Sequence, residues 1–406
     1  MNNTTCSASP SLLTATPTAE PTSANWMGIV SLALGVFGLV TAEFLPASLL
    51  TAMAADLNIS VGAAGQAVTA TAAVAALAAL TIPLLTRNFD RRFVLLGLSL
   101  LLVISNALAA TANSFFVLIF ARVLLGIALG GFWSMAAALA MRMVPDNLFA
   151  RAMSIVLTGV SVATVCAAPL GAYIGGLWGW RSAFIAAGFL SLITLVTQLF
   201  TIPAMPPKDN PSLRILFQLL KRTQVRVVLL AVVLMISGHF AGFTYIRPLL
   251  EEVAQLSVSA ISAVLLGFGI GGFFGNFAGA FIAERSERNA IIFGGALIIA
   301  ITITLLFAGS LASVTAVSIA LWGFAFGAFP IGFQAWIVRA APDQVEAAGG
   351  LIVAAFQVAI ASGAIGGGIL VDYLGALGGP LLALITTSLG TLLVLSFGPR
   401  TQRPAW

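Results

Sequence analysis

Apolar residues in this chain are grouped into long stretches that alternate with short polar gaps. A helix needs about 20 mostly apolar residues to cross the hydrocarbon core of a bilayer, and twelve stretches are long enough. They cover residues 27–53, 61–85, 93–112, 115–141, 152–177, 183–202, 227–250, 257–283, 290–310, 312–338, 347–371 and 377–398. The pattern therefore predicts an all-α membrane protein with twelve transmembrane helices.

The gaps between these stretches differ in charge. Fifteen of the 18 Lys and Arg residues fall in the even-numbered gaps and the C-terminal tail, whereas the odd-numbered gaps contain only Arg181. Short loops rich in Lys and Arg remain on the cytoplasmic side of a membrane. We therefore expect both termini to be cytoplasmic.

The two halves of the chain repeat each other at an offset of 197 positions. Residues 142–146 read RMVPD, and residues 339–343 read RAAPD. Two glycines and an acidic–basic pair recur at the same offset: Gly126, Gly130, Asp90 and Arg91 return as Gly323, Gly327, Glu287 and Arg288. The offset spans an even number of helices, so both halves have the same membrane orientation. Two parallel six-helix repeats of this kind describe the major facilitator fold.

This repeat defines the expected organisation of the chain. Residues 27–202 form the N-terminal six-helix half, and residues 227–398 form the C-terminal half. Residues 203–226 are expected to be the cytoplasmic linker. Residues 1–26 are rich in Ser, Thr, Ala and Pro and are expected to be a disordered cytoplasmic tail, and residues 399–406 a second, short one.

Composition narrows the class of function. Hydrophobic residues make up 60% of the chain and charged residues 8%, with a mean hydropathy of +1.08, which excludes a soluble domain. The basic residues lie at the predicted membrane face without interleaved aromatic residues, so we expect no nucleic-acid partner. The sequence contains no metal-ligand cluster, phosphate loop or catalytic constellation. We therefore expect a protein that is not an enzyme and has no cofactor or metal.

Ionisable residues inside the predicted spans are the main functional candidates, because each costs about 2.5–3.5 kcal/mol on insertion. Glu43 lies 16 residues, or about 24 Å, into a span that starts on the cytoplasmic side. Arg122 lies about 10 Å from the outer end of its span, at a compatible depth. The two residues could form a static structural ion pair. They could instead couple transport to protons, with Glu43 as the carboxylate that gains and loses them.

His239 is the only histidine in the chain and falls opposite Glu43 at the repeat offset less one. Its titration range suits proton handling, although a single histidine is often a hydrogen-bonded core residue. Arg247 lies near the outer end of its span, where it could contact a ligand or extend its charged end to the interface.

Polar and aromatic residues within the spans could supply a substrate surface. Aromatic rings stack on planar groups, and Gln and Asn amides form hydrogen bonds with them, although each residue could equally serve packing. The candidates are Phe132, Trp133, Tyr245, Arg247, Asn276, Gln334, Trp336 and Gln357.

From Asn25 to Pro399 the chain resembles the major facilitator superfamily, specifically its bacterial drug- and sugar-efflux group of proton antiporters. Residues 43–46 (EFLP) resemble the first-span signature of that group. Arg122 with Gly126 and Gly130 is similar to the fourth-span motif linked to proton coupling. Residues 169–176 resemble the fifth-span antiporter motif, although Ala168 replaces the usual glycine before proline.

The strings EFLPASLL, GQAVT, LGGFW, MRMVP and FTYIRP are similar to the purine ribonucleoside exporters within this group. This resemblance implies a monomer in the bacterial inner membrane that exports inosine- and guanosine-type nucleosides by proton antiport. Its partners would be the small-molecule substrate, protons and the lipid bilayer. An arabinose-like sugar exporter or a multidrug exporter on the same fold is the alternative. A membrane receptor without transport would need an appended signalling domain, for which the spans leave no room.

Overall fold

The computed structural model describes residues 24–145, 148–206 and 213–399. In these ranges twelve helices are long and apolar enough to cross a membrane, which confirms the predicted all-α fold class. They are α1 (Trp26–Leu57), α2 (Val61–Leu85), α3 (Arg91–Ala110), α4 (Phe115–Met141), α5 (Phe149–Trp178), α6 (Trp180–Thr201), α8 (Thr223–Thr244), α10 (Val258–Arg285), α11 (Glu287–Ala308), α12 (Ala312–Ala340), α13 (Val345–Leu374) and α14 (Gly378–Phe397). The predicted tails, residues 1–26 and 399–406, lie almost entirely outside the described residues.

Short polar side chains set the start of several helices. The Ser60 hydroxyl accepts a hydrogen bond from the Ala63 amide at the start of α2, and Ser257 does the same for Ala260 at the start of α10. Such caps satisfy one of the amide groups that a helix leaves unpaired at its N-terminus. At the other end of α13, Gly375 has a φ of 73°, a conformation that favours glycine.

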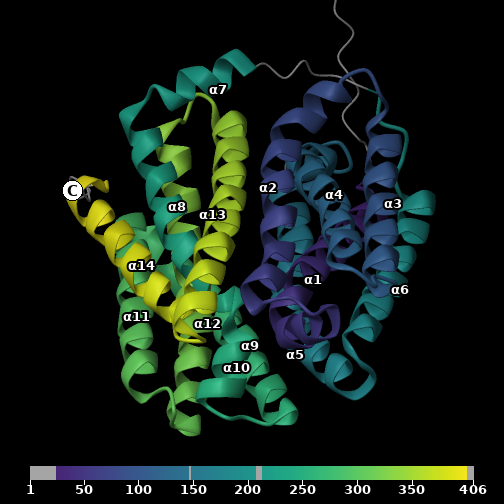
Figure 1. The fold of residues 1–406 in the computed structure, drawn as a ribbon. Helices are drawn as coiled ribbons and strands as arrows, with labels where there is room; N and C mark the ends of the chain where they lie inside the picture. The colour runs from purple at the N-terminus through teal and green to yellow at the C-terminus, as the bar shows by residue number, and fades with distance from the viewer. Residues whose placement is uncertain (1–23, 146–147, 207–212, 400–406) are drawn as a thin grey trace, which may run out of the picture.

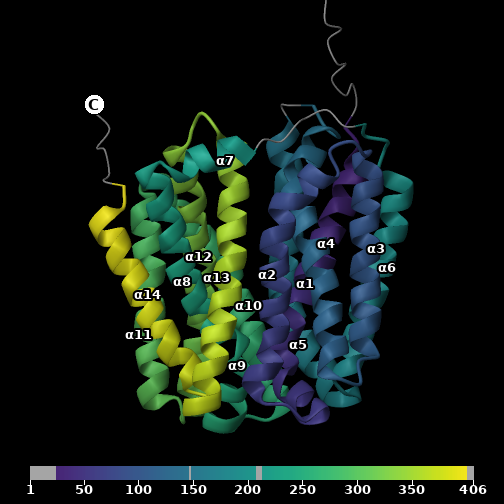
Figure 2. The same cartoon turned by 45° about the horizontal axis from the view of Figure 1, so that its top comes forward.

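Two groups of helices stand side by side, α1–α6 in one and α8–α14 in the other (Figures 1 and 2). In the first half, Gly126 of α4 lies against the backbone carbonyl of Thr71 in α2. In the second half, Gly323 of α12 lies against the carbonyl of Phe268 in α10. One turn further along, the same relationship joins Gly130 to Ala75 and Gly327 to Gly272. Both members of each contact are shifted by 197 positions, so the internal repeat of the sequence is also a repeat of packing.

These four glycines form two close helix–helix contacts, which we call the glycine ladders: α2 with α4, and α10 with α12. A Cβ atom on any of the four would collide with a backbone carbonyl of the neighbouring helix. Only glycine allows backbones to approach so closely. Each half is therefore held together by contacts that leave no room for a side chain.

The predicted span 227–250 is interrupted in the structure. Helix α8 ends at Thr244, a three-residue helix α9 (Ile246–Pro248) follows, and a π-helical turn covers Leu249–Val253. Proline has no amide hydrogen, and its ring clashes with the carbonyl of residue i−4, which here is Thr244. Pro248 therefore accounts for a break that hydropathy alone did not predict.

The predicted linker contains a short helix, α7 (Leu213–Leu220), that the sequence analysis missed. It lies across the end of the second half, beside α8 and α13 (Figure 2). Leu219 is buried and Phe217 is exposed, as expected for an amphipathic helix at a membrane surface. Just after α7, Arg222 forms a two-pronged ion pair with Asp343, with both N···O distances at 2.6 Å. This pair fixes the end of the linker to the α12–α13 loop.

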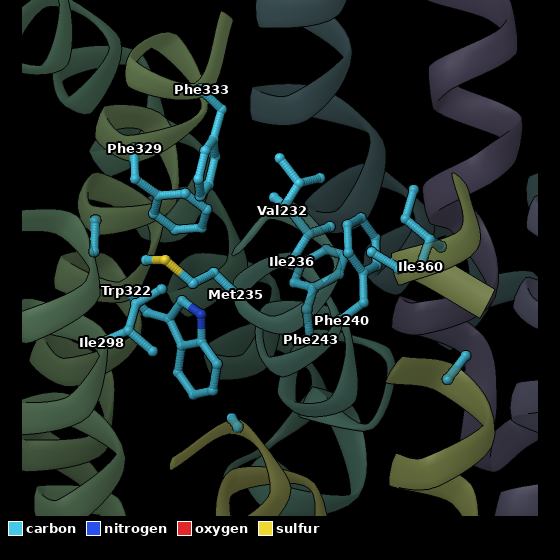
Figure 3. Close-up of a cluster of buried hydrophobic side chains, with 14 of the residues drawn as sticks. Val232, Met235, Ile236, Phe240, Phe243, Ile298, Trp322, Phe329, Phe333 and Ile360 are labelled. Atoms are coloured by element: carbon cyan, nitrogen blue, oxygen red, sulfur yellow. The ribbon is translucent and has the colours of Figure 1, made fainter. Parts of the chain in front are cut away.

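Large apolar side chains fill the interior of the second half. Val232 and Met235 of α8 face Trp322, Phe329 and Phe333 of α12 (Figure 3). All five are at most 2% exposed. Buried aromatic side chains contribute strongly to packing energy. This packing fixes the position of α8, which faces the first half.

Candidate functional site

Arg122 is completely buried in the first half, where it joins three helices. Its Nη2 donates a 2.7 Å hydrogen bond to the carbonyl of Ala42 in α1, and its Nε donates a 3.2 Å hydrogen bond to the Thr71 hydroxyl in α2. Its guanidinium also lies 5.8 Å from the ring centre of Phe184 in α6. The remaining nitrogen, Nη1, has no hydrogen-bonding partner in the protein.

Pro46 explains why the Ala42 carbonyl is available to Arg122. In a regular helix this carbonyl would accept from the amide of residue 46, but proline has no amide hydrogen. The Arg122 guanidinium replaces the missing donor. The proline of the EFLP string therefore creates the acceptor that holds the buried arginine.

Glu43 is 8% exposed and follows Ala42 in α1. Its carboxyl group interacts with the charge of Arg122, and the side-chain amide of Gln357 in α13 lies within hydrogen-bonding reach of it. Ion pairs among the described residues join Arg181 to Asp56, Arg222 to Asp343, Arg247 to Glu251 and Arg339 to Glu287. Glu43 and Arg122 are in none of these pairs, and Glu43 Oε1 lacks a hydrogen-bonding partner in the protein. The predicted pair is thus brought together without direct ion-pair contact.

His239 lies in an aromatic cage in α8. Its ring is stacked on Phe326 with centroids 3.6 Å apart and is also parallel to Phe243 at 5.5 Å. Its Nδ1 accepts a 3.0 Å hydrogen bond from the Trp322 indole N–H. Nδ1 is therefore unprotonated in this arrangement, and any proton on the neutral ring is on Nε2. Binding a second proton would require the loss of the Trp322 hydrogen bond.

Aromatic side chains also meet where the two halves face each other near Glu43. Phe44 of α1 is partly buried, and its ring centre lies 5.5 Å from that of Phe243 and 6.3 Å from that of Phe240 in α8. Phe240 in turn contacts the partly buried Phe326 edge to face. Both halves therefore contribute rings within one or two contacts of the Glu43 position.

Beyond Glu43, away from the basic loops, the two halves are joined by polar contacts that we call the seam. Asp372, at the end of α13, accepts hydrogen bonds from the Gly62 amide at 2.9 Å and from the Ser60 hydroxyl at 2.8 Å. The Tyr245 hydroxyl donates to the Ala364 carbonyl at 2.8 Å and lies 3.4 Å from that of Gly62.

Arg247 belongs to the same seam. It forms an ion pair with Glu251 at 2.7 Å, and its Nη1 donates to the carbonyl of Ser48 in α1. Both Arg247 and Tyr245 are buried and have protein partners. The structure thus places two predicted substrate residues in contacts that close one end of the interface between the halves.

The remaining predicted substrate residues do not gather in one place. The Trp336 indole donates to Gln224 at the basic end of α8, whereas Tyr245 follows the other end of that helix. At 1.5 Å per residue these positions are about 31 Å apart along α8, too far to contact one small molecule. Phe132 is buried in the core of the first half. Trp133 and Asn276 are partly buried, Gln334 is exposed and Gln357 is buried beside Glu43.

Three residues near these groups were not predicted. Thr71 holds Arg122, Asp372 closes the seam, and the Phe326 ring covers His239. Asp372 could have been found, because it is an acidic residue directly after a long apolar stretch. Among the residues that the structure describes, no group of three or more His, Cys, Asp or Glu side chains is arranged to hold a metal ion.

Comparison with known proteins agrees with this architecture. The family profile described as Major Facilitator Superfamily matches residues 32–348 and 255–406. The chain belongs to the major facilitator superfamily. It is therefore a multi-pass membrane transporter and not an enzyme, and the family predicted from the sequence motifs is confirmed.

Curated members of this superfamily resemble the chain closely. The purine ribonucleoside efflux pump NepI of Salmonella paratyphi B is 40% identical over 354 residues, which cover 87% of this chain and 89% of that relative. The protein of the same name from Salmonella typhimurium has the same identity and coverage. The predicted resemblance to purine ribonucleoside exporters is thus confirmed at the level of sequence similarity.

A solved major facilitator structure shares the fold. A bacterial homologue of the human lysosomal transporter Spinster, in an inward-facing and unoccupied conformation, superposes with a TM-score of 0.73. The match covers 94% of this chain and 99% of that one, at 14% sequence identity. At this identity the similarity shows a common fold only.

Proposed function

We propose that this transporter exports purine ribonucleosides of the inosine and guanosine type in exchange for protons. The observation that carries the proposal is the 40% identity, over 87% of the chain, to relatives named purine ribonucleoside efflux pumps. The basic loops face the cytoplasm in this proposal, in accordance with the positive-inside rule. The seam then lies on the outer side, and the structure corresponds to the state that is closed toward the outside.

Glu43 is the proposed proton-coupling carboxylate, and Arg122 is its charge partner. A carboxyl group that is buried beside a fixed guanidinium has two competing influences on its proton affinity: burial favours the neutral acid, and the positive charge favours the carboxylate. Small changes in hydration on opening toward either side therefore change its proton occupancy. One charge that crosses 100 mV supplies about 2.3 kcal/mol, enough for roughly a 45-fold substrate gradient at a one-to-one ratio.

The proposed substrate surface lies beside Glu43, where the halves meet. The partly buried rings of Phe44 and Phe326 could stack on a purine base, and the Gln357 amide offers both a donor and an acceptor. Partly buried Trp133 and Asn276 and exposed Gln334 are further proposed contacts. Stacking is largely indifferent to the kind of purine, whereas an amide can discriminate an oxo group from an amino group.

Transport into inside-out vesicles tests this function. An imposed proton gradient should drive uptake of radiolabelled inosine, and excess guanosine should compete with it while arabinose should not. Glu43→Gln should abolish gradient-driven uptake and leave substrate exchange measurable. Asp56→Asn is the control, because Asp56 pairs with Arg181 within the first half and lies outside the proposed site.

The same vesicles distinguish the alternatives. Uptake of arabinose or of cationic dyes without nucleoside competition would assign the chain to sugar or multidrug efflux. Gradient-driven inosine uptake by Glu43→Gln at the wild-type rate would refute the role of Glu43.

A further inference from the structure

Gln357 and Glu43 face each other from different halves. Glu43 is on α1 of the first half, and Gln357 is on α13 of the second half. Their side chains are 8% and 5% exposed, and the Gln357 amide is within hydrogen-bonding reach of the Glu43 carboxyl. The pair is therefore a buried polar contact across the interface, on the inner side of the seam.

Each of the two residues has one oxygen atom without a partner. Glu43 Oε1 and Gln357 Oε1 are both buried and have no hydrogen-bonding partner in the protein. A carboxylate oxygen and an amide oxygen are both acceptors, so they cannot satisfy each other. Buried acceptors without a donor are costly and rare.

A single proton would satisfy both oxygens. Protonated Glu43 has an O–H group, and this group can donate to Gln357 Oε1. The unprotonated carboxylate needs donors instead, and the nearest unused donor of its own half is Arg122 Nη1. The two protonation states thus have preferred partners in different halves of the protein.

We propose that Gln357 is the positioning residue that links proton binding to closure of the seam. In this inference the protonated Glu43 donates to Gln357 Oε1 across the interface and holds the two halves together on the outer side. The inference rests on the proposed proton coupling at Glu43 and assigns to Gln357 a role that differs from substrate contact.

Other charged groups on the helices that pack against α1 are already engaged. Arg247 is held by Glu251 and the Ser48 carbonyl. Arg181 and Asp56 form a pair beyond the seam. His239 Nδ1 accepts from Trp322. Cys166 of α5 lines an apolar cavity with Thr41, away from the second half. Arg122 is therefore the charged group that competes with Gln357 for the Glu43 carboxyl.

This link gives the proton a defined path and effect. A proton from the outer water binds a Glu43 oxygen while the seam is open, and the O–H group then finds Gln357 Oε1 as the halves close. After opening toward the cytoplasm the same proton leaves to water. The carboxylate turns to Arg122, and the contact with the second half is lost. Proton release therefore weakens outer closure at the stage at which an exporter must open outward.

Distance measurements on the full-length protein test the inference without substrate. Spin labels are placed at Ala55 and Tyr373, which are exposed at the outer ends of α1 and α13, in a chain with Cys6→Ser and Cys166→Ala. Acidification should increase the short-distance, closed population of the otherwise wild-type protein. Glu43→Gln should be closed at every pH, because its amide N–H donates to Gln357 as the protonated acid would. Gln357→Leu should lose the pH response, and the Glu43→Gln/Gln357→Leu double variant should lose its closed bias.

The controls separate this role from general stability. Gln357→Met is a second apolar replacement in case Leu packs poorly. Ser362→Ala is the matched control on α13, because Ser362 bonds only to its own helix at Ala359. A wild-type pH response in either Gln357 variant overturns the inference, as does a Glu43→Gln protein without a closed bias.

The same data separate this inference from the proposed function. Failure of nucleoside uptake with an intact pH response refutes the proposed substrate and leaves the Gln357 link standing. Absence of any pH response in the wild type refutes proton coupling at Glu43, and the link with it.

Discussion

Asp372 caps a helix of the opposite half: its Oδ1 accepts the amide hydrogen of Gly62 at 2.9 Å, and its Oδ2 accepts the Ser60 hydroxyl at 2.8 Å. Negative groups are favourable at helix N-termini. The equivalent crossing in the repeat, between the end of α5 and the start of α10, is an apolar contact of Gly176 with Val258. The outer closure is thus built from one polar and one apolar crossing.

Removal of the Asp372 carboxylate should favour separation of the halves at the seam. Asp372→Ala loses two hydrogen bonds of about 0.5–1 kcal/mol each, a shift of about five- to thirtyfold toward the open state. Asp372→Asn should have a smaller effect, because one acceptor oxygen remains. The Ala55–Tyr373 label distance measures this population. Asp56→Asn, which breaks a pair within one half, should leave it unchanged.

Arg122 should tolerate lysine better than alanine, and neither as well as arginine. Lysine keeps the charge but lacks the planar fork that reaches the Ala42 carbonyl and the Thr71 hydroxyl together. Loss of a charged hydrogen bond of about 1.5–3 kcal/mol corresponds to about a 10- to 150-fold loss of transport rate. Initial rates of gradient-driven uptake measure this order. Equal rates in all three proteins would refute it. Arg181→Lys is the surface control, since Arg181 also bonds a backbone carbonyl.

His239 should act as a hydrogen-bond acceptor for Trp322 and not as a second proton carrier. Asparagine can place its Oδ1 near the position of Nδ1 and does not titrate between acidic and neutral pH. His239→Asn should therefore keep the wild-type pH profile of transport, whereas His239→Leu should lower thermal stability. A shifted pH midpoint in His239→Asn would instead support the proton-handling role suggested by the sequence.

The ion pair at the end of the linker should not contribute to pH dependence in the physiological range. Hydrogen bonds from the Arg222 guanidinium lower the pKa of the Asp343 carboxyl from 3.8 to about 2. A lowered pKa stabilises the fold at pH values above 3.8, and this contribution is lost as the pH falls through about 2. Asp343→Asn should therefore change thermal stability by the same amount at pH 6 and at pH 8. A difference between the two would contradict this sign.

The glycine ladders should not accept alanine. Gly323→Ala places a methyl group against the Phe268 carbonyl, and overpacking of this kind costs about 1–3 kcal/mol. Gly349 in α13 has open space where a Cβ would lie, so Gly349→Ala should instead stabilise the helix by about 0.5–1 kcal/mol. Thermal unfolding in detergent measures both changes, and they should have opposite signs.

Much of the fold follows from the sequence because a membrane leaves few alternatives to long apolar helices. The twelve spans and the depth of Glu43 and Arg122 come directly from helix length. The break at Tyr245 was missed because hydropathy averages over Pro248. Helix α7 was missed because eight residues are too few for a hydropathy window, although their apolar spacing is helical.

The candidate site was less predictable because it depends on which way side chains point. Tyr245 and Trp336 appeared to be partners from residue type alone, yet they are fixed at opposite ends of α8. The bond from Arg122 to Ala42 could not be predicted without knowing that the two helices touch, although Pro46 signalled a free carbonyl. Residue type indicated the chemistry, and only packing decided which groups meet.

The contrast between the ladders and the seam divides mutations into two kinds. A change on a ladder disturbs one half internally and therefore harms the inward and outward conformations alike. A change on the seam alters the balance between conformations and leaves each half intact. A selection for altered export direction or altered drug resistance should thus recover variants along the seam. A screen for loss of protein from the membrane should recover them along the ladders.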